Sequence, residues 1–488
     1  MTNRKKIFYC LLFLISGLDL RAQNISSANL STSGINFIQK DSLQKLIIKE
    51  ISVSGNNKTK LPVILHELPF NLNDSVSVSK LHVLLDQARV QLYNTTLFDM
   101  VRVESIITSS STVNVSITVK ERWYIYPVPQ FQLVDRNFND WYKTFNHSLT
   151  RVNYGLKFAD YSLTGKRDQL NVYLINGYSR NISFSYNKPY SNAKLNRGYA
   201  VAAGYTQNRE IAYNSGNNNR VLFYPVDSVI KKTNNFVRNG WFLNASYLIR
   251  KGFFKRHYFL ISYTYLKVDD SVILKNANYF KDAVNAKGFP EISYTYQYNN
   301  VDNVAYSLIG TTAYLSILKR GFGFNEGLDM LSIDAGLNKY FTLKKNWFAN
   351  FQLNTKIKFP FEQGYFNQRG LGYGDAYLRG LEYNVIDGVV YALLRTTLKK
   401  KLFSFNIPFP FIPKILTKIP FTFFAKTYSD IGYVYNKTKY DTYLSNRLLY
   451  TGGFGIDVLT LYDINLRFEY SFNQLHEKGL FFHTQNGF

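Results

Sequence analysis

The sequence has almost no cysteine. Cys10 is the only one among 488 residues, and it lies in a short apolar stretch that we expect to be removed during export. The mature protein is therefore expected to contain neither disulfides nor a cysteine-ligated metal. A lipoprotein needs its cysteine at the cleavage site, so lipid attachment is not expected either.

The first residues have the features of an export signal. Residues 2–6 (TNRKK) are basic, residues 7–18 are mostly apolar, and Ala22 is a small residue after which cleavage is expected. This pattern predicts a signal peptide over 1–22, because the apolar stretch is too short for a membrane span. A buried N-terminal helix is the alternative. Residues 23–45, rich in serine and asparagine, predict a flexible linker.

Long hydrophobic runs are also missing. After residue 23 no apolar run approaches the ~18–20 residues that a transmembrane helix needs. Even the stretch IPFPFIPKILTKIPFTFF, residues 407–424, is interrupted by prolines and lysines. A membrane protein without spanning helices has to satisfy its backbone polar groups in a closed β-barrel. The remaining choices are a soluble exported protein and an outer-membrane barrel.

Acidic residues are scarce relative to basic ones. Lysine and arginine number 58 against 33 aspartates and glutamates, a formal net charge of +25. The sequence contains no DNA- or RNA-binding motif, so a nucleic-acid partner is not expected. We assign the excess charge to solvated loops and lumen walls, with contact to lipid phosphates at the membrane rim as the functional alternative.

Catalytic and cofactor motifs are lacking as well. None of the six histidines lies in a nucleophile motif or at metal-ligand spacing, and no glycine-rich phosphate loop is present. We therefore expect no catalytic residue, no metal site and no cofactor, which disfavours an outer-membrane enzyme. The histidines are His66, His82, His147, His257, His476 and His483.

Aromatic residues, in contrast, are abundant. They make up 17% of the chain, yet the mean hydropathy is only −0.19, so apolar and polar residues have to be interleaved, as in β-strands. From Trp123 onward, alternating segments of ~9–11 residues are separated by turns, the signal of a transmembrane barrel. In 241–249, 259–265 and 292–298 every second residue is apolar or aromatic. The prediction is a mainly β chain with an antiparallel barrel over 123–488. A soluble β-sandwich is the alternative.

A smaller unit precedes this region. Residues 46–122 have the order strand, helix, helix, strand, strand, and the alternation of Val113, Val115, Ile117 and Val119 is the clearest two-residue period in the chain. Together with NTTLFDMVRVE (94–104) and the exit VKERW (119–123), this order resembles one POTRA domain, a small α+β periplasmic module. The resemblance implies that the strand Met100–Ile107 lies at a sheet edge and accepts an extended client by β-augmentation.

Four motifs in the second region resemble the BamA/TamA-type outer-membrane assembly superfamily. They are NNVDNVAYSLIG (299–310), with Ser307 where proline is usual; YLRGLEY (377–383), with Leu381 in place of an aromatic; YSDIGYVYN (428–436); and the closing segment 463–488. Single motifs of this kind are weak. Their order and spacing behind a POTRA-like module make the resemblance specific over almost all of the mature chain.

The resemblance implies an outer-membrane barrel of sixteen strands with the POTRA domain in the periplasm. It implies that a loop carrying Leu378, Arg379, Gly380 and Leu381 folds into the lumen, where Arg379 pairs with Asp430 of a strand that also contains Gly432. It further implies weak pairing between the first strand, near Val128–Val134, and the last strand, Gly479–Phe488, which contains Phe482 and the terminal Phe488.

The implied function is assembly and insertion of outer-membrane β-barrel proteins by strand exchange at that weak junction. The expected partners are unfolded outer-membrane or secreted protein clients, membrane lipids and accessory lipoproteins. The alternative is a translocation pore for one secreted polypeptide. Pores of this type usually carry two POTRA domains and general assembly factors several, so a single copy favours a specialised paralogue.

Overall fold

The structure of the chain is a computed structural model. It describes residues 44–133, 151–223, 236–323, 328–408, 418–438 and 442–485. The expected signal peptide and nearly all of the expected linker lie outside these ranges. Within them, no helix combines the length and the apolar character needed to cross a bilayer.

The N-terminal domain is a four-stranded sheet with two helices. The sheet order is β2-β1-β4-β3, with β1 and β4 parallel and β3 antiparallel to β4. The strand expected at Met100–Ile107 is β3, and it lies at the sheet edge as the resemblance implied. The short strand β2 was not predicted. The elements are β1 (Lys45–Ser54), α2 (Leu61–His66), β2 (Ser75–Ser77), α3 (Val78–Tyr93), β3 (Phe98–Ile107) and β4 (Thr112–Glu121).

The alternation in β4 builds the core of this domain. Val113, Val115, Ile117 and Val119 are at most 3% exposed, whereas the residues between them are only partly buried. They pack in one cluster with the apolar face of α3, including Leu92. The two-residue period in the sequence therefore marks the buried face of a central strand.

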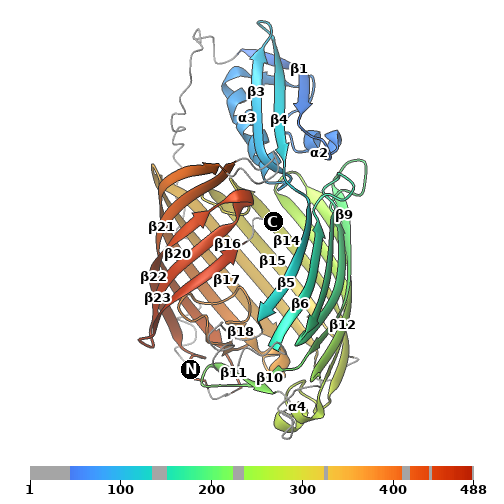
Figure 1. Ribbon diagram of the computed structural model, residues 1–488, viewed down its shortest axis with the longest axis vertical. Coiled ribbons are helices and arrows are strands. Elements are labelled where there is room, and N and C mark those ends of the chain that lie inside the picture. The colour runs from blue at the N-terminus through green and yellow to red at the C-terminus, as the bar shows by residue number, and fades with distance from the viewer. Residues whose placement is uncertain are drawn as a thin grey trace, which may run out of the picture. The chain divides into compact units, whose positions relative to one another are not determined.

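The second region forms one antiparallel sheet of sixteen strands. Each strand pairs with the barrel strand next to it along the chain, and the tilted strands wrap around a common axis (Figure 1). A soluble sandwich of two sheets is thereby excluded. The strands are β5 (Ile125–Leu133), β6 (Val152–Asp160), β7 (Gln169–Gly177), β8 (Ser179–Lys188), β9 (Arg197–Asn208), β12 (Arg238–Lys251), β13 (Lys255–Val268), β14 (Ala286–Val301), β15 (Gly310–Arg320), β16 (Met330–Lys344), β17 (Trp347–Phe359), β20 (Val390–Pro408), β21 (Lys418–Tyr435), β22 (Leu448–Leu459), β23 (Asn465–Asn473) and β24 (Lys478–Gln485).

The outer surface of this sheet is apolar. Leu243 on β12 is 54% exposed and Ile261 on β13 is 64% exposed, while the inward Ser262 is 4% exposed. Exposed large hydrophobic side chains recur on nearly every strand of the barrel. Water does not favour such a surface, but hydrocarbon does. The barrel is therefore a transmembrane one.

Shorter elements lie in the connections between barrel strands. All but the last belong to loops at the end of the barrel opposite to the start of β5. Because β4 ends only a few residues before β5 begins, the N-terminal domain joins the barrel at the β5-start end. The short elements are β10 (Ile211–Gly216), β11 (Asn219–Phe223), α4 (Asp270–Lys275), η3 (Tyr365–Asn367), β18 (Arg369–Leu371), β19 (Ile386–Asp387) and, in the β22–β23 turn, η5 (Leu461–Asp463).

Candidate functional site: the inward loop and the barrel seam

The connection between β17 and β20 folds into the barrel. Leu378 and Leu381 are 1% and 2% exposed. They pack in one apolar cluster with Leu393 of β20 and Val434 of β21. This cluster fixes the position of the loop that contains the YLRGLEY motif, which we call the inward loop (residues 369–388).

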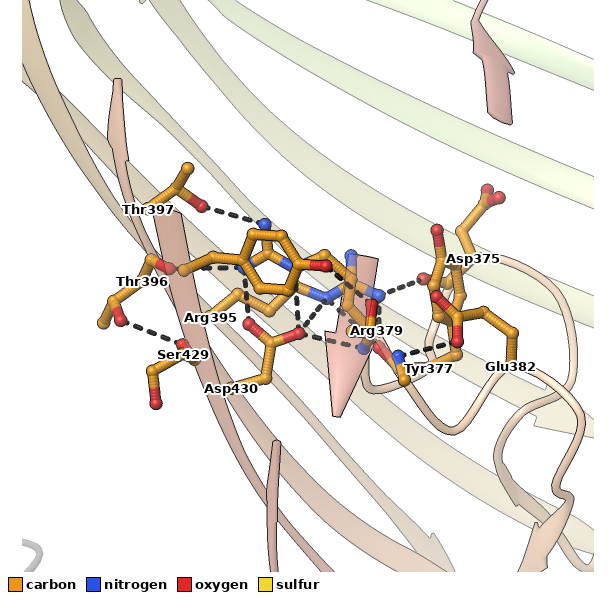
Figure 2. A network of polar contacts seen from close by, with 12 residues as sticks. Asp375, Tyr377, Arg379, Glu382, Arg395, Thr396, Thr397, Ser429 and Asp430 are labelled. Atoms are coloured by element: carbon orange, nitrogen blue, oxygen red, sulfur yellow. Dashed lines mark hydrogen bonds and ion pairs between the residues drawn. The ribbon is translucent and has the colours of Figure 1, made fainter. Parts of the chain in front are cut away.

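Arg379 of the inward loop contacts Asp430 of β21. Asp430 accepts three hydrogen bonds: from Arg379 Nε to Oδ2 at 2.9 Å, from Nη2 to Oδ1 at 2.5 Å, and from the backbone N to Oδ2 at 3.0 Å (Figure 2). The exposed fractions are 0% for Asp430 and 7% for Arg379. A bidentate pair of this kind is directional, and removing either partner strands a buried charge.

The remaining guanidinium donors of Arg379 also have acceptors. Nη1 donates to Thr397 Oγ1 at 3.0 Å and Nη2 donates to the Thr396 carbonyl at 3.2 Å. The ring of Tyr428 lies 4.0 Å from the guanidinium carbon, within the range of a cation–π contact. The side chain is thus held from β20 and β21 together.

A second arginine supports the same loop. Arg395 of β20 lies opposite Asp430 in the β20–β21 register, with its Nε 3.9 Å from Oδ2. It donates hydrogen bonds to the carbonyls of Tyr377 and Asp375, each at 3.1 Å. Arg395 was not among the predicted site residues, because in the sequence it is an ordinary inward position of an alternating strand.

Two glycines permit this close packing. A Cβ on Gly432 would lie 2.9 Å from Leu378 Cδ1, so a side chain at 432 competes with the buried leucine. Gly380 has φ +96°, a conformation that glycine adopts readily and other residues rarely do. Its carbonyl accepts a hydrogen bond from Asn473 Nδ2 at 2.7 Å.

The inward loop also reaches the last strand. Glu382 Oε2 accepts a hydrogen bond from the backbone N of Gly380 at 2.6 Å, and Glu382 Oε1 lies 3.6 Å from His483 Nε2 of β24. The rings of Tyr377 and His483 stack at 5.9 Å between centroids. One loop therefore contacts β20, β21, β23 and β24.

The inward loop separates two polar cavities of the lumen. Gly370, Tyr373 and Ala376 line a cavity of about 640 Å³ toward the loop end of the barrel. Tyr377 and Arg379 line a cavity of about 460 Å³ on the other side. The loop thus occupies the middle of the lumen between them.

The first and last strands of the barrel are not paired with each other in the described residues. β5 pairs with β6 and β24 pairs with β23, and neither has a hydrogen-bonded neighbour on its other side. We call this junction the seam; in Figure 1 the first strands (teal) and the last strands (red) border it. Phe488 and Val134, which were expected in these strands, lie outside the described residues.

The expected residues of the last strand face two directions. Phe482 is 56% exposed on the outside and packs against Phe468 of β23, with centroids 4.9 Å apart. Gly479 pairs with Ser471 of β23. One face of β24 thus meets lipid, and the other carries His483 toward the inward loop.

Two prolines in β5, which were not among the predicted site residues, lie at the seam. Pro127 and Pro129 pair in register with Phe158 and Leu156 of β6. A strand proline has no N–H and is tolerated where that N–H faces away from a paired neighbour. The edge of β5 that faces the seam therefore lacks two backbone N–H donors. Alternating prolines in the segment IYPVPQFQL were the signal available in the sequence.

The motif at 299–310 forms the tight turn between β14 and β15. Asp302 Oδ1 accepts hydrogen bonds from the backbone N of Leu308 at 3.0 Å and of Ile309 at 3.1 Å. Ser307, which stands where the family has proline, donates from Oγ to the Asn303 carbonyl at 2.7 Å. The serine thus fixes this turn with a hydrogen bond in place of a rigid ring.

Among the described residues, no group of three or more histidine, cysteine, aspartate or glutamate side chains is arranged to hold a metal ion. His147 lies outside the described ranges.

Comparison with known proteins identifies the N-terminal domain. A family model described as "POTRA: Surface antigen variable number repeat" matches residues 46–122. This region is a POTRA domain. No curated protein matches the sequence.

Solved structures share the fold of nearly the whole chain. CdiB from Escherichia coli is 11% identical with a TM-score of 0.53, over 91% of this chain and 76% of that chain. BamA from Haemophilus ducreyi lacking POTRA domains 1–3 is 16% identical with a TM-score of 0.49, over 90% and 84%. CdiB from Acinetobacter baumannii is 14% identical with a TM-score of 0.46, over 90% and 73%. The chain therefore shares the fold of CdiB over nearly its whole length, with one POTRA domain before the barrel.

Buried ion pairs join the POTRA domain to turns of the barrel. Glu67, at the end of α2, receives two hydrogen bonds of 2.6 Å from Arg250 Nη1 and Nη2 and one of 2.5 Å from Tyr190. Burial alone raises the pKa of Glu67, but the bonds and charge of Arg250 outweigh it and lower that pKa to about 2. Arg122 forms a second pair with Asp463 at 2.6 Å.

Proposed function

We propose that the protein assembles β-barrel proteins into the outer membrane by exchanging strands at the seam. The observation that carries the proposal is the seam itself, where β5 and β24 each keep one free edge in the described residues. An unpaired strand edge is a template for another chain. A client strand that pairs with β24 or β5 gains backbone hydrogen bonds while its outer face remains in lipid.

The prolines of β5 support this mechanism. With donors missing at Pro127 and Pro129, closing the seam gains fewer hydrogen bonds than closing an ordinary pair of strands. The free edge is then available to a client at a smaller loss of native pairing. Because no covalent bond is made or broken, the mechanism uses no catalytic residue and no cofactor.

The POTRA domain provides a second edge for clients. Met100 and Ile106 on β3 are 43% and 65% exposed, and β3 pairs only with β4. We propose that an unfolded client adds to β3 in the periplasm before it reaches the seam. Accessory lipoproteins and membrane lipids are further proposed partners.

The inward loop supports assembly over the rival function, a polypeptide pore. It occupies the lumen between two cavities and is bound by the Arg379–Asp430 pair. In a polypeptide pore this loop has to move out of the lumen before a polypeptide can pass through it. In an assembly factor it stays and supports β20–β24 while the seam opens.

A locking experiment tests the seam. Cys10 is the only native cysteine and lies in the expected signal peptide. Cysteines introduced at Val128 of β5 and Phe482 of β24 can therefore form a disulfide only with each other within the mature chain. In a culture that depends on this variant, oxidation is expected to stop delivery of new barrel proteins and reduction to restore it. Each single-cysteine variant serves as the control. Normal assembly with the seam fully cross-linked contradicts strand exchange.

A census of the outer membrane separates the two functions. After depletion of the protein, loss of several β-barrel proteins supports assembly, and loss of one exported product with an unchanged barrel set supports a dedicated pore. A photo-crosslinking amino acid at Ile106 of β3 is expected to capture clients. The same amino acid at Val83 of α3, which is 46% exposed, is the matched control.

A further inference from the structure

Two polar cavities adjoin at the loop end of the lumen. One has a volume of about 640 Å³ and the other about 290 Å³. Arg220 of β11, Arg369 of β18 and Tyr373 line both of them. The two cavities therefore form one region of the lumen, which we call the loop-end chamber.

Cationic side chains dominate the lining of the loop-end chamber. Six arginines and lysines line it, against the two carboxylates of Asp334 and Glu210. Five different strands supply these cations, so the charge converges on one space and is not confined to one face of one element. The cations are Arg220, Arg238, Arg320, Lys356, Lys358 and Arg369.

Two of the six cations are neutralised by carboxylates. Arg320 Nε lies 2.7 Å from Glu291 Oε1, and Lys356 Nζ lies 2.7 Å from Asp334 Oδ2. These pairs belong to neighbouring strands of the wall.

The other four cations have no acidic partner among the described residues. Lys358 donates only to main-chain carbonyls, those of Asn367 and Arg369, at 2.7 Å each. Arg369 lies over the rings of Phe366 and Tyr373. Neither Arg220 nor Arg238 forms an ion pair within the described ranges. Lys358 is buried, and a buried cation without a counter-charge is costly unless an anion is bound. Arg220 and Arg369 are exposed, so their guanidinium groups are accessible to such an anion.

The other carboxylates nearby are already engaged. Glu210 accepts a hydrogen bond from Tyr178 at 2.9 Å. Asp387 accepts one from the hydroxyl of Tyr373. Neither carboxylate forms an ion pair with Arg220, Arg238 or Arg369 in the described residues, so the donors of these three guanidinium groups are available to a ligand.

We propose that the loop-end chamber is a binding site for a phosphate-bearing anion. Guanidinium groups present planar forks that match the oxygens of a phosphate group, and several cations suit a multiply charged anion. Arg220 and Arg369 line both cavities and bind the phosphate, with Arg238 and Lys358 adding charge from either side. Because Arg369 begins the inward loop, a bound anion ties that loop to the barrel wall.

The test measures anion binding by the full-length protein purified in a phosphate-free detergent. Pyrophosphate is titrated at constant ionic strength while thermal unfolding is followed by tryptophan fluorescence. A saturable rise in melting temperature is expected, with affinity about tenfold lower or worse in Arg369→Gln and in Arg220→Gln, because each removes a charge-assisted contact. Arg447→Gln, an exposed arginine outside the chamber, is expected to match the wild type.

A second arm identifies the source of the phosphate. The protein is placed in nanodiscs containing lipid A with its phosphates or lipid A from which they have been removed. Stabilisation by pyrophosphate points to a soluble ligand, and stabilisation by phosphorylated lipid A alone points to a lipid headgroup. The proposal is overturned if neither stabilises the protein, or if both arginine variants respond as the wild type does.

Arg220→Gln is the variant least expected to misfold, so a loss of pyrophosphate binding in it can be assigned to the lost side chain. Arg220 is exposed on the short β10–β11 hairpin, which is not part of the sixteen-stranded sheet, so its substitution is expected to leave the barrel folded. Heat-dependent migration on gels verifies folding of each variant before binding is measured.

Discussion

Asp430 on β21 accepts three hydrogen bonds from Arg379, which lies 51 residues earlier in the inward loop. One of the three comes from the backbone of Arg379, so the carboxylate fixes the path of the loop as well as the direction of the side chain. Carboxylate and guanidinium are both buried.

Charge reversal tests the proposed role of this pair. Arg379→Glu places a second carboxylate beside buried Asp430, and the loss of a buried partner costs ~3–5 kcal/mol. We expect reduced assembly of client barrels and partial rescue by adding Asp430→Arg. Rescue is expected to be partial, because the backbone N–H at position 379 loses its acceptor Asp430 and faces the introduced arginine instead. The readout is the amount of folded client in the outer membrane.

The exposed Arg447 supplies the control for this experiment. Arg447→Glu changes the net charge equally but lies outside the inward loop, so it is expected to leave client levels unchanged. Full activity of Arg379→Glu alone contradicts a positioning role for the pair.

Replacing the prolines of β5 is expected to strengthen the pairing between β5 and β24 across the seam. Replacing Pro127 and Pro129 with valine restores two backbone donors, so β5 is expected to pair more tightly with β24 and to admit client strands more slowly. Cysteines at Val128 and Phe482 should then cross-link faster than in the parent, while assembly of clients falls. Pro290→Val, at a strand proline distant from the seam, is the matched control. Unchanged cross-linking in the double variant removes the assigned role of these prolines.

Gly432 predicts a steric coupling to the inward loop. Gly432→Ala puts a methyl group 2.9 Å from Leu378 Cδ1, and overpacking of this kind costs roughly 1–3 kcal/mol. The melting temperature is expected to fall. Adding Leu378→Ala makes room for the methyl group, so the double variant should lose less than the two single changes together. Strict additivity means that the two positions do not interact.

The Glu67–Arg250 pair predicts a pH dependence of the POTRA attachment. The pKa of Glu67 falls from 4.5 to about 2 when it is paired, so its contribution is complete above pH 4.5 and is lost as the pH falls toward 2. A difference of this size corresponds to roughly 3 kcal/mol. Hydrogen exchange of α2 is expected to increase across that window, and Glu67→Gln should show the increase at neutral pH. A wild-type profile that stays flat from pH 5 to 2 contradicts the prediction.

Much of the architecture was accessible from local patterns. The alternation in 113–119 predicted a strand, and the alternation in 241–265 predicted which side chains face lipid, because a strand turns successive side chains to opposite faces. The motifs named Arg379 and Asp430 as partners, and the structure brings them together. Their role in assembly stays a prediction.

Other parts of the site had no local signal. In the sequence Arg395 is one more polar residue in an alternating strand. Only the β20–β21 register shows that it lies opposite Asp430. The prolines of β5 were visible in the sequence, but their meaning depends on β5 being the first strand of the sheet. A proline in a strand is informative only when its neighbours are known.

The sequence by itself determined the chain's two parts and the inward and outward faces of its strands, because these depend on short-range periodicity and composition. The loop that carries Arg379 was implied by the resemblance of its motif. Tertiary structure decided which charges meet. The Arg379–Asp430 and Glu67–Arg250 pairs join residues tens to hundreds of positions apart, and the loop-end chamber gathers cations from five different strands. These residues come together only in the folded chain.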